Sequence, residues 1–121
     1  MDEPAHVLVV EDNAAVSSAM RILFEYAGRR VSVAASVVEA LGIGTTDPAA
    51  LVLLDLTLPD GNGLDLIEPL RAAGCGAVVA LTGHDDEATR ARCLAAGCVD
   101  VFVKPVPARE LVARSAPWLD G

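Results

Sequence analysis

The fold is decided by the stretch LVLLDLTLPDGNG at residues 51–63. It opens with a continuous apolar run that ends at Asp55, and a turn-rich segment with Pro59 and two glycines follows. A run of Leu and Val without polar alternation favours a strand that is covered on both faces. The tight turns expected after it can bring backbone carbonyls close to a bound metal ion. We therefore expect a buried parallel strand that places Asp55 at the edge of a sheet.

Further apolar runs and five helical patterns surround this stretch. The apolar runs cover residues 7–10, 31–34, 51–54, 78–81 and 99–103. Helices are predicted from Asn13 to Gly28, at 37–43 with an end at Gly44, at 64–73, at 86–96 and at 108–118. Alternating strands and helices with right-handed crossovers predict an α/β fold, a doubly wound five-stranded parallel sheet with five helices. Pro69 inside the third helix predicts a kink or a shortened helix.

Length and charge limit the class of protein. The 121 residues predict a single domain over 1–121. With 9 Lys and Arg against 17 Asp and Glu, the formal charge is −8, which disfavours direct binding to nucleic acid. No apolar run approaches the roughly 20 residues of a membrane span, and the first residues do not resemble a signal peptide. Cys75, Cys93 and Cys98 form no C-x-x-C pair, so we expect buried thiols in a reducing cytoplasm.

Charged and polar residues follow the ends of the predicted strands. They are Glu11, Asp12, Asp55, Thr82 and Lys104. Because the active crevice of an open parallel sheet lies at the carboxyl ends of its strands, we expect these side chains to converge. Three adjacent carboxylates repel one another unless a cation joins them. An oxygen-only set of ligands suits Mg²⁺ better than zinc.

This constellation fits phosphoryl transfer to a carboxylate. Asp55 is the candidate nucleophile, which would become an acyl phosphate. Lys104 and a metal ion would neutralise the phosphoryl oxygens, and Thr82 would hydrogen-bond one of them.

Other polar residues are expected to have structural roles. We expect His6 on the surface where the first strand begins, and Asp86 as the cap of the helix that follows it.

At these motifs the sequence resembles the receiver (REC) domains of two-component response regulators. The matching segments are residues 9–13, 53–63, 81–83, Gly97 and 103–105, in that order along nearly the whole chain. The resemblance implies a flavodoxin-like sheet with strand order 2-1-3-4-5. It also implies a phosphorelay role, in which Asp55 accepts a phosphoryl group from the phosphohistidine of a histidine kinase or phosphotransfer protein. Such a domain catalyses only its own phosphorylation and dephosphorylation, and phosphorylation switches its contacts with a downstream effector.

The resemblance also assigns roles to the site residues. It implies that Mg²⁺ is bound by Asp12, Asp55 and the backbone carbonyl of Thr57, with Glu11 acting through water. Thr82 and Lys104 would contact the phosphoryl group, and the bond between Lys104 and Pro105 would be cis. Homodimers through the helices at 86–96 and 108–118 are a further option that the family implies.

The sequence departs from the family at one position. Many receivers have Tyr or Phe three residues before the lysine, where this chain has Val101. The family's aromatic switch cannot operate there in its usual form. Because strand side chains alternate, we expect the neighbouring Phe102 to point to the other face. His84 lies two residues after Thr82, where the resemblance places it beside the water that attacks the acyl phosphate; an ordinary exposed histidine is an equal alternative.

Two other functions compete with the phosphoacceptor hypothesis. One is a receiver-like binding module that signals without phosphorylation, which Val101 favours and the intact acidic set with Lys104 disfavours. The other is a small phosphatase of the haloacid dehalogenase type, because Asp55 and Thr57 follow an apolar strand. That class normally has its motif on the first strand and a longer chain, so this alternative is the weaker one.

Overall fold

A five-stranded parallel sheet lies at the centre of the computed structural model, which describes residues 4–120. Its strands are β1 (His6–Val10), β2 (Arg30–Ala34), β3 (Leu51–Asp55), β6 (Ala77–Thr82) and β7 (Asp100–Val103). They are ordered β2-β1-β3-β6-β7, and all neighbours are parallel. This confirms the predicted order 2-1-3-4-5. Two further strands, β4 (Thr57–Leu58) and β5 (Gly61–Asn62), form a separate antiparallel ribbon, which was not predicted from the sequence.

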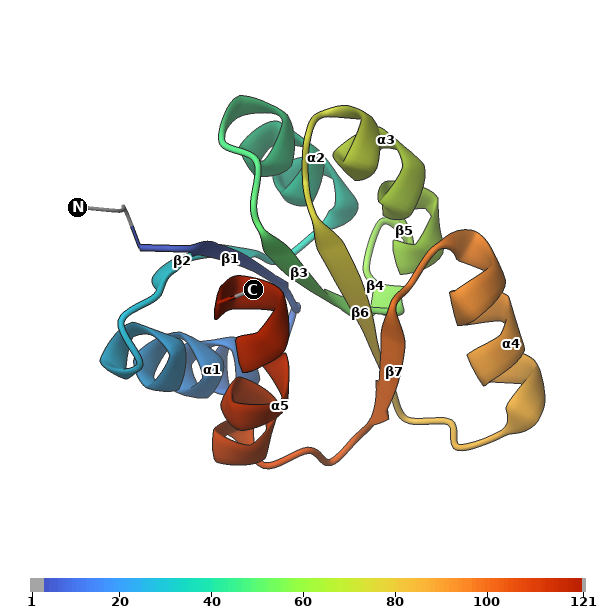
Figure 1. Cartoon of the computed structure of the whole chain (residues 1–121). Helices are drawn as coiled ribbons and strands as arrows, with labels where there is room; N and C mark the ends of the chain where they lie inside the picture. Colours follow the sequence, from blue (N-terminus) through green and yellow to red (C-terminus); the bar gives the residue numbers. More distant parts are fainter. Residues whose placement is uncertain (1–3, 121) are drawn as a thin grey trace.

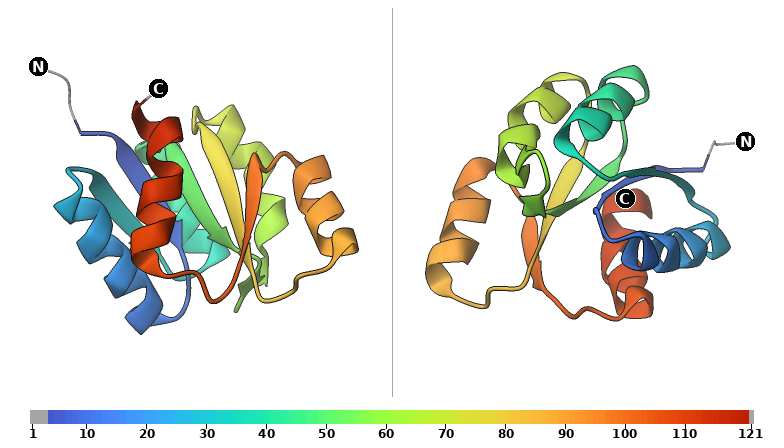
Figure 2. Two further views of the ribbon diagram at one scale, coloured as in Figure 1. Left: turned by 60° about the horizontal axis from the view of Figure 1, so that its bottom comes forward. Right: turned by 180° about the vertical axis from the view of Figure 1, so that it is seen from behind.

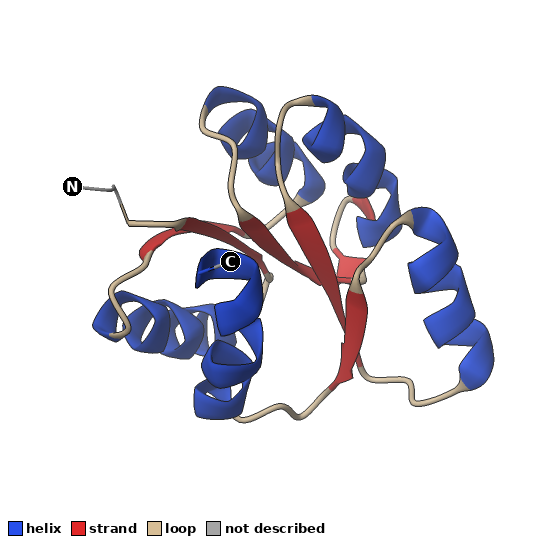
Figure 3. Ribbon diagram, in the orientation of Figure 1, coloured by secondary structure: helices blue, strands red, loops and turns tan. Residues whose placement is uncertain are grey.

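Helices cover both faces of the sheet (Figures 1 and 2). On one face lie α1 (Ala14–Tyr26) and α5 (Ala108–Asp120). On the other lie α2 (Val37–Thr46), α3 (Ile67–Ala72) and α4 (Glu87–Ala96). Figure 3 shows the same alternation of strand and helix along the chain. No helix within residues 4–120 is long and apolar enough to cross a membrane.

The strands supply both halves of the apolar core through their alternating side chains. Leu53 packs with α1 and α5, whereas its neighbour Leu54 packs with the helices of the opposite face. Val101 and Phe102 divide in the same way, as predicted. Phe102 also packs against Trp118 of α5, with ring centroids 6.4 Å apart. Burial on both faces explains why the strand sequences are continuous rather than alternating.

Two helix boundaries differ from expectation. The prediction that the second helix ends at Gly44 was wrong, because α2 continues to Thr46. A Cβ at Gly44 would collide with the Leu70 side chain of α3, so this glycine permits close helix packing rather than termination. The predicted third helix is shortened. A 3₁₀ turn (Gly63–Leu66) precedes α3, and Pro69 lies in the first turn of α3, where its missing N–H costs little.

Two expectations about polar side chains had opposite outcomes. His6 is buried rather than exposed, and its Nε2 lies 2.7 Å from the Ser32 hydroxyl of β2. The prediction for Asp86 is confirmed, since its carboxylate accepts a hydrogen bond from the Thr89 amide at 2.7 Å and caps α4. The three thiols are free and buried, as expected.

Candidate functional site

The predicted acidic residues meet at the carboxyl end of the sheet. β1 and β3 are direct neighbours, so Glu11, Asp12 and Asp55 leave the sheet side by side. One carboxylate oxygen from each lies within 4.8 Å of the others. Glu11 and Asp55 are only 3% and 6% exposed, whereas Asp12 is exposed. Two buried carboxylates at such short range need positive charge nearby.

Lys104 supplies part of that charge from the edge of the sheet. Its Nζ donates to Glu11 Oε2 at 3.0 Å and to Asp55 Oδ2 at 3.2 Å. Lys104 is the residue directly after β7, and its peptide bond to Pro105 is cis, as the resemblance implied. The lysine thus links the ends of three strands across the site.

Burial and neighbouring charges shift the pKa values of this network. Burial raises the pKa of Glu11; the Lys104 hydrogen bond lowers it and the nearby Asp55 raises it, with a net increase. For Lys104, burial alone would lower the pKa, but hydrogen bonds to Glu11 and Asp55 outweigh burial and raise it. The ammonium is therefore held in its charged form, while the carboxylates still carry excess negative charge.

The segment after β3 returns tightly to the site. The Thr57 amide donates to Asp55 Oδ1 at 3.0 Å, and the Gly63 amide donates to the Leu56 carbonyl at 3.3 Å. A Cβ at Gly63 would lie 2.5 Å from the backbone oxygen of Asp55, so only glycine allows this approach. The β4–β5 ribbon thereby keeps the Thr57 backbone beside the acidic cluster.

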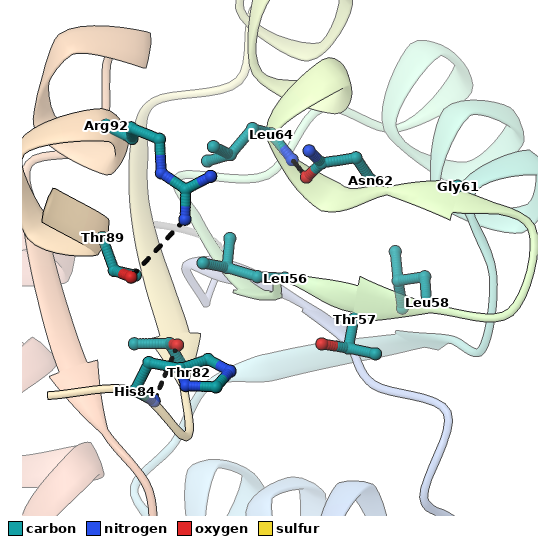
Figure 4. Close-up of a pocket in the computed structure, with 10 residues that line it drawn as sticks. All are labelled: Leu56, Thr57, Leu58, Gly61, Asn62, Leu64, Thr82, His84, Thr89 and Arg92. Carbon is teal, nitrogen blue, oxygen red and sulfur yellow. Dashed lines mark hydrogen bonds between the residues drawn. The ribbon is translucent and has the colours of Figure 1, made fainter. Parts of the chain in front are cut away.

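Thr82 completes the set from the end of β6. Its hydroxyl is buried and accepts a hydrogen bond from the His84 amide at 3.1 Å. Its carbonyl accepts one from the Lys104 amide at 2.7 Å, which ties the two residues together through the backbone. In Figure 4 the His84 ring extends from Thr82 towards Thr57. The structure thus brings together all the residues that the sequence proposed for this site.

The oxygen donors fit a hard divalent cation. With all three carboxylates ionised and Lys104 protonated, the charge of the cluster is −3 + 1 = −2. A divalent cation would balance this charge, and carboxylate and carbonyl oxygens are the ligands that Mg²⁺ prefers. Within residues 4–120, Glu11, Asp12 and Asp55 are the group of His, Cys, Asp or Glu side chains that lie close enough together to share an ion.

Sequence reasoning missed one anchor of the site. Asp60, at the tip of the ribbon, accepts hydrogen bonds from the Val37 and Val38 amides of α2 at 2.8 and 3.2 Å. The ribbon is thus fixed to a helix on the same face of the sheet. The Pro-Asp-Gly turn signalled a bend, but nothing in the sequence identified the distant amides that Asp60 would bind.

Comparison with known proteins gives a consistent result. Residues 7–116 match the family described as the response regulator receiver domain. TorR of Escherichia coli O157:H7, the TorCAD operon transcriptional regulatory protein, is 37% identical over 111 residues, which are 92% of this chain and 48% of that protein. The chain thus spans about half the length of the curated relatives it matches.

Solved structures agree in fold. A CheY-like receiver domain protein from Methanospirillum hungatei JF-1 has a TM-score of 0.88 at 27% identity, over 97% of this chain and 94% of that one. The receiver domain of a sensor histidine kinase from Pseudomonas aeruginosa PAO1 has a TM-score of 0.83 at 26% identity, over 98% of this chain and 99% of that one. The latter is described with a magnesium ion coordinated in its active site cleft.

Proposed function

We propose, from the premise that the chain belongs to the response regulator receiver domain family, that Asp55 is its phosphoacceptor. Membership makes the chain a phosphoacceptor signalling domain of two-component systems. The observation that supports Asp55 is its position: a carboxylate at the end of the central strand, held by the Thr57 amide on one oxygen and by Lys104 on the other. Residues 1–121 as a whole would then form one receiver domain.

The reaction follows from these contacts. A carboxylate oxygen of Asp55 bonds to phosphorus while the P–N bond of a phosphohistidine breaks, and the imidazole nitrogen leaves with the bonding electrons. Lys104 would then pair with a phosphoryl oxygen, and the Thr82 hydroxyl would donate to another. The domain would act only on its own carboxylate, by accepting the phosphoryl group and later losing it to water.

Mg²⁺ is the proposed cofactor. Asp12, Asp55 and the backbone carbonyl of Thr57 would hold it directly, and Glu11 would act through water. When bound, Mg²⁺ supplies positive charge that offsets the charge of the phosphoryl oxygens. The net negative charge of the cluster and its oxygen donors, two of them from the buried carboxylates Glu11 and Asp55, support this role.

The partners we propose are a histidine kinase or phosphotransfer protein as donor and a downstream effector as target, in the cytoplasm. The relatives named as transcriptional regulators are about twice as long as this chain, so the effector would be a further domain or a separate protein.

Phosphorylation would act through Thr82 and the hydrogen bond between its carbonyl and the Lys104 amide, because Val101 replaces the usual aromatic residue. A homodimer through α4 and α5 would cover a face on which Asp100 pairs with Arg90 and Arg114 within each chain.

A small phosphodonor such as acetyl phosphate, with Mg²⁺, tests the assignment. Intact-mass spectrometry should show a gain of one phosphoryl group, which Asp55→Asn abolishes and Asp65→Asn, at an exposed carboxylate, preserves. No gain in the wild-type protein would favour a binding module that works without phosphorylation. Rapid hydrolysis of a free phosphate ester would instead favour the phosphatase alternative.

A further inference from the structure

A cavity of about 370 Å³ opens beside the proposed phosphoacceptor, between the β4–β5 ribbon and α4 (Figure 4). Leu56, Leu58 and Leu64 form an apolar wall on the ribbon side. Arg92 and Thr89 of α4 line the opposite side. Thr57, Thr82 and His84 line the end that adjoins the acidic cluster. The cavity therefore joins an apolar surface, a cation and the edge of the reaction site.

The charge of the cavity is opposite to that of the protein. The chain carries −8, yet no carboxylate is among the residues that line this space. Asp86, which caps α4, already accepts hydrogen bonds from the amide and the hydroxyl of Thr89, at 2.7 and 3.0 Å. The Arg92 guanidinium extends over the cavity and donates only a long, 3.5 Å hydrogen bond to Thr89. The Thr89 amide and hydroxyl, with a smaller contribution from the nearby Arg92, hold the pKa of Asp86 below its usual value. Within residues 4–120 Arg92 forms no direct ion pair with a carboxylate, so its remaining donors are available for a ligand.

We propose that this cavity binds a small organic carboxylate that carries a flat apolar group. The planar guanidinium of Arg92 matches a carboxylate in two parallel hydrogen bonds. The leucine wall would cover the apolar group, and one ring nitrogen of His84 is a further donor in either neutral tautomer. Inorganic phosphate lacks the apolar part and would meet stronger repulsion from the net negative protein. The volume lies near the lower limit for small-molecule sites, about 300 Å³, which favours a ligand of one or two rings.

A ligand in this position would also affect the phosphorylated state; this part rests on the proposed function of Asp55. Hydrolysis requires a water oxygen to bond to phosphorus while the P–O bond to Asp55 breaks, which releases inorganic phosphate and restores the carboxylate. Thr57, Thr82 and His84 form the boundary between the cavity and that reaction site. A ligand covering this boundary excludes water from one side, so it should lengthen the lifetime of the acyl phosphate.

Amide chemical shifts of the unphosphorylated full chain test binding without requiring phosphorylation. The probes are 2-naphthoate, its neutral isostere 2-naphthamide, and acetate, which lacks the ring. We expect 2-naphthoate to shift the amides of residues 56–64 and 89–92 and to bind about tenfold more tightly than either control. Arg92→Gln should weaken 2-naphthoate about tenfold, whereas Arg109→Gln removes an equal charge from exposed α5 and should change nothing. Circular dichroism confirms that both variants fold.

Several outcomes would overturn the proposal. The carboxylate site would be rejected if 2-naphthamide and 2-naphthoate bound equally, or if both arginine variants lost the same affinity for 2-naphthoate. Chemical shift changes confined to other surfaces would also reject it. These outcomes do not depend on whether Asp55 is phosphorylated. The lifetime is measured by intact mass after removal of acetyl phosphate, with and without 2-naphthoate. An unchanged decay rate at saturating ligand rejects the effect on hydrolysis. If the wild-type protein never gains a phosphoryl group, the proposed function fails while the binding result still stands.

Discussion

The Lys104 ammonium lies 3.2 Å from a carboxylate oxygen of Asp55, although the two residues are 49 positions apart in the chain. Asp55 ends the central strand β3 and Lys104 follows the edge strand β7, with β6 between them. The same ammonium also reaches Glu11. A single flexible cation therefore partly compensates two buried carboxylates, and its loss should have separate effects on chemistry and on stability.

Replacement of this cation, Lys104→Ala, should slow phosphorylation of Asp55 strongly and destabilise the metal-free protein by about 1–3 kcal/mol. The lysine side chain is one-third exposed, so solvent weakens its ion pairs, but its loss leaves the buried Glu11 and Asp55 carboxylates without their cation. Urea unfolding in EDTA measures the stability, and intact mass after acetyl phosphate treatment measures the reaction. A variant that is unfolded, yet phosphorylated normally in its native fraction, would contradict the role given to Lys104.

Addition of Mg²⁺ should stabilise the wild-type protein by mass action. A ligand that binds only the folded state contributes about 2.7 kcal/mol when its concentration is 100 times its dissociation constant. Asp12→Asn removes a proposed ligand and should abolish most of this gain, whereas Asp85→Asn, an exposed acid outside the cluster, should retain it. Thermal unfolding with and without Mg²⁺ makes the comparison. Equal stabilisation of both variants would mean that the ion binds elsewhere.

The sequence predicts the fold and the members of the site because both depend on strand ends. Asp55 and Lys104 each follow an apolar run, and parallel topology alone brings such positions to one edge. The fine structure depends on contacts between distant residues and is not readable in this way. Gly44 has the pattern of a helix stop, but the Leu70 side chain decides its role. His6 sits at a strand entry, yet neighbouring elements bury it. The Asp60 anchor likewise exists only once α2 is folded against the ribbon.

Alanine at two glycines should have opposite effects. Gly63→Ala places a Cβ against the Asp55 backbone oxygen, so the ribbon must move and we expect a loss of about 1–3 kcal/mol. Gly42 lies in exposed helix with open space around its Cβ position, so Gly42→Ala should stabilise by roughly 0.5–1 kcal/mol. Urea unfolding of both proteins checks the pair. If Gly63→Ala were as stable as wild type, the close approach of Gly63 to Asp55 would not constrain the ribbon.

The contribution of Asp60 to the stability of the folded protein should depend on pH. The Val37 amide, with a smaller contribution from the Val38 amide, holds the pKa of Asp60 below its usual value. A carboxyl with a depressed pKa in the folded state stabilises the protein above its unfolded pKa, near 3.8, and this contribution is lost as pH falls through the folded pKa. Asp60→Asn should therefore unfold at a lower temperature than wild type at pH 7, and the difference should shrink as the pH drops below 4. Asp65→Asn, at an exposed carboxylate with no recorded partner among the described residues, serves as the matched control and should follow the wild-type curve. A temperature difference for Asp60→Asn that is constant from pH 7 to pH 3 would show that charge at the α2 amides does not hold the ribbon in place.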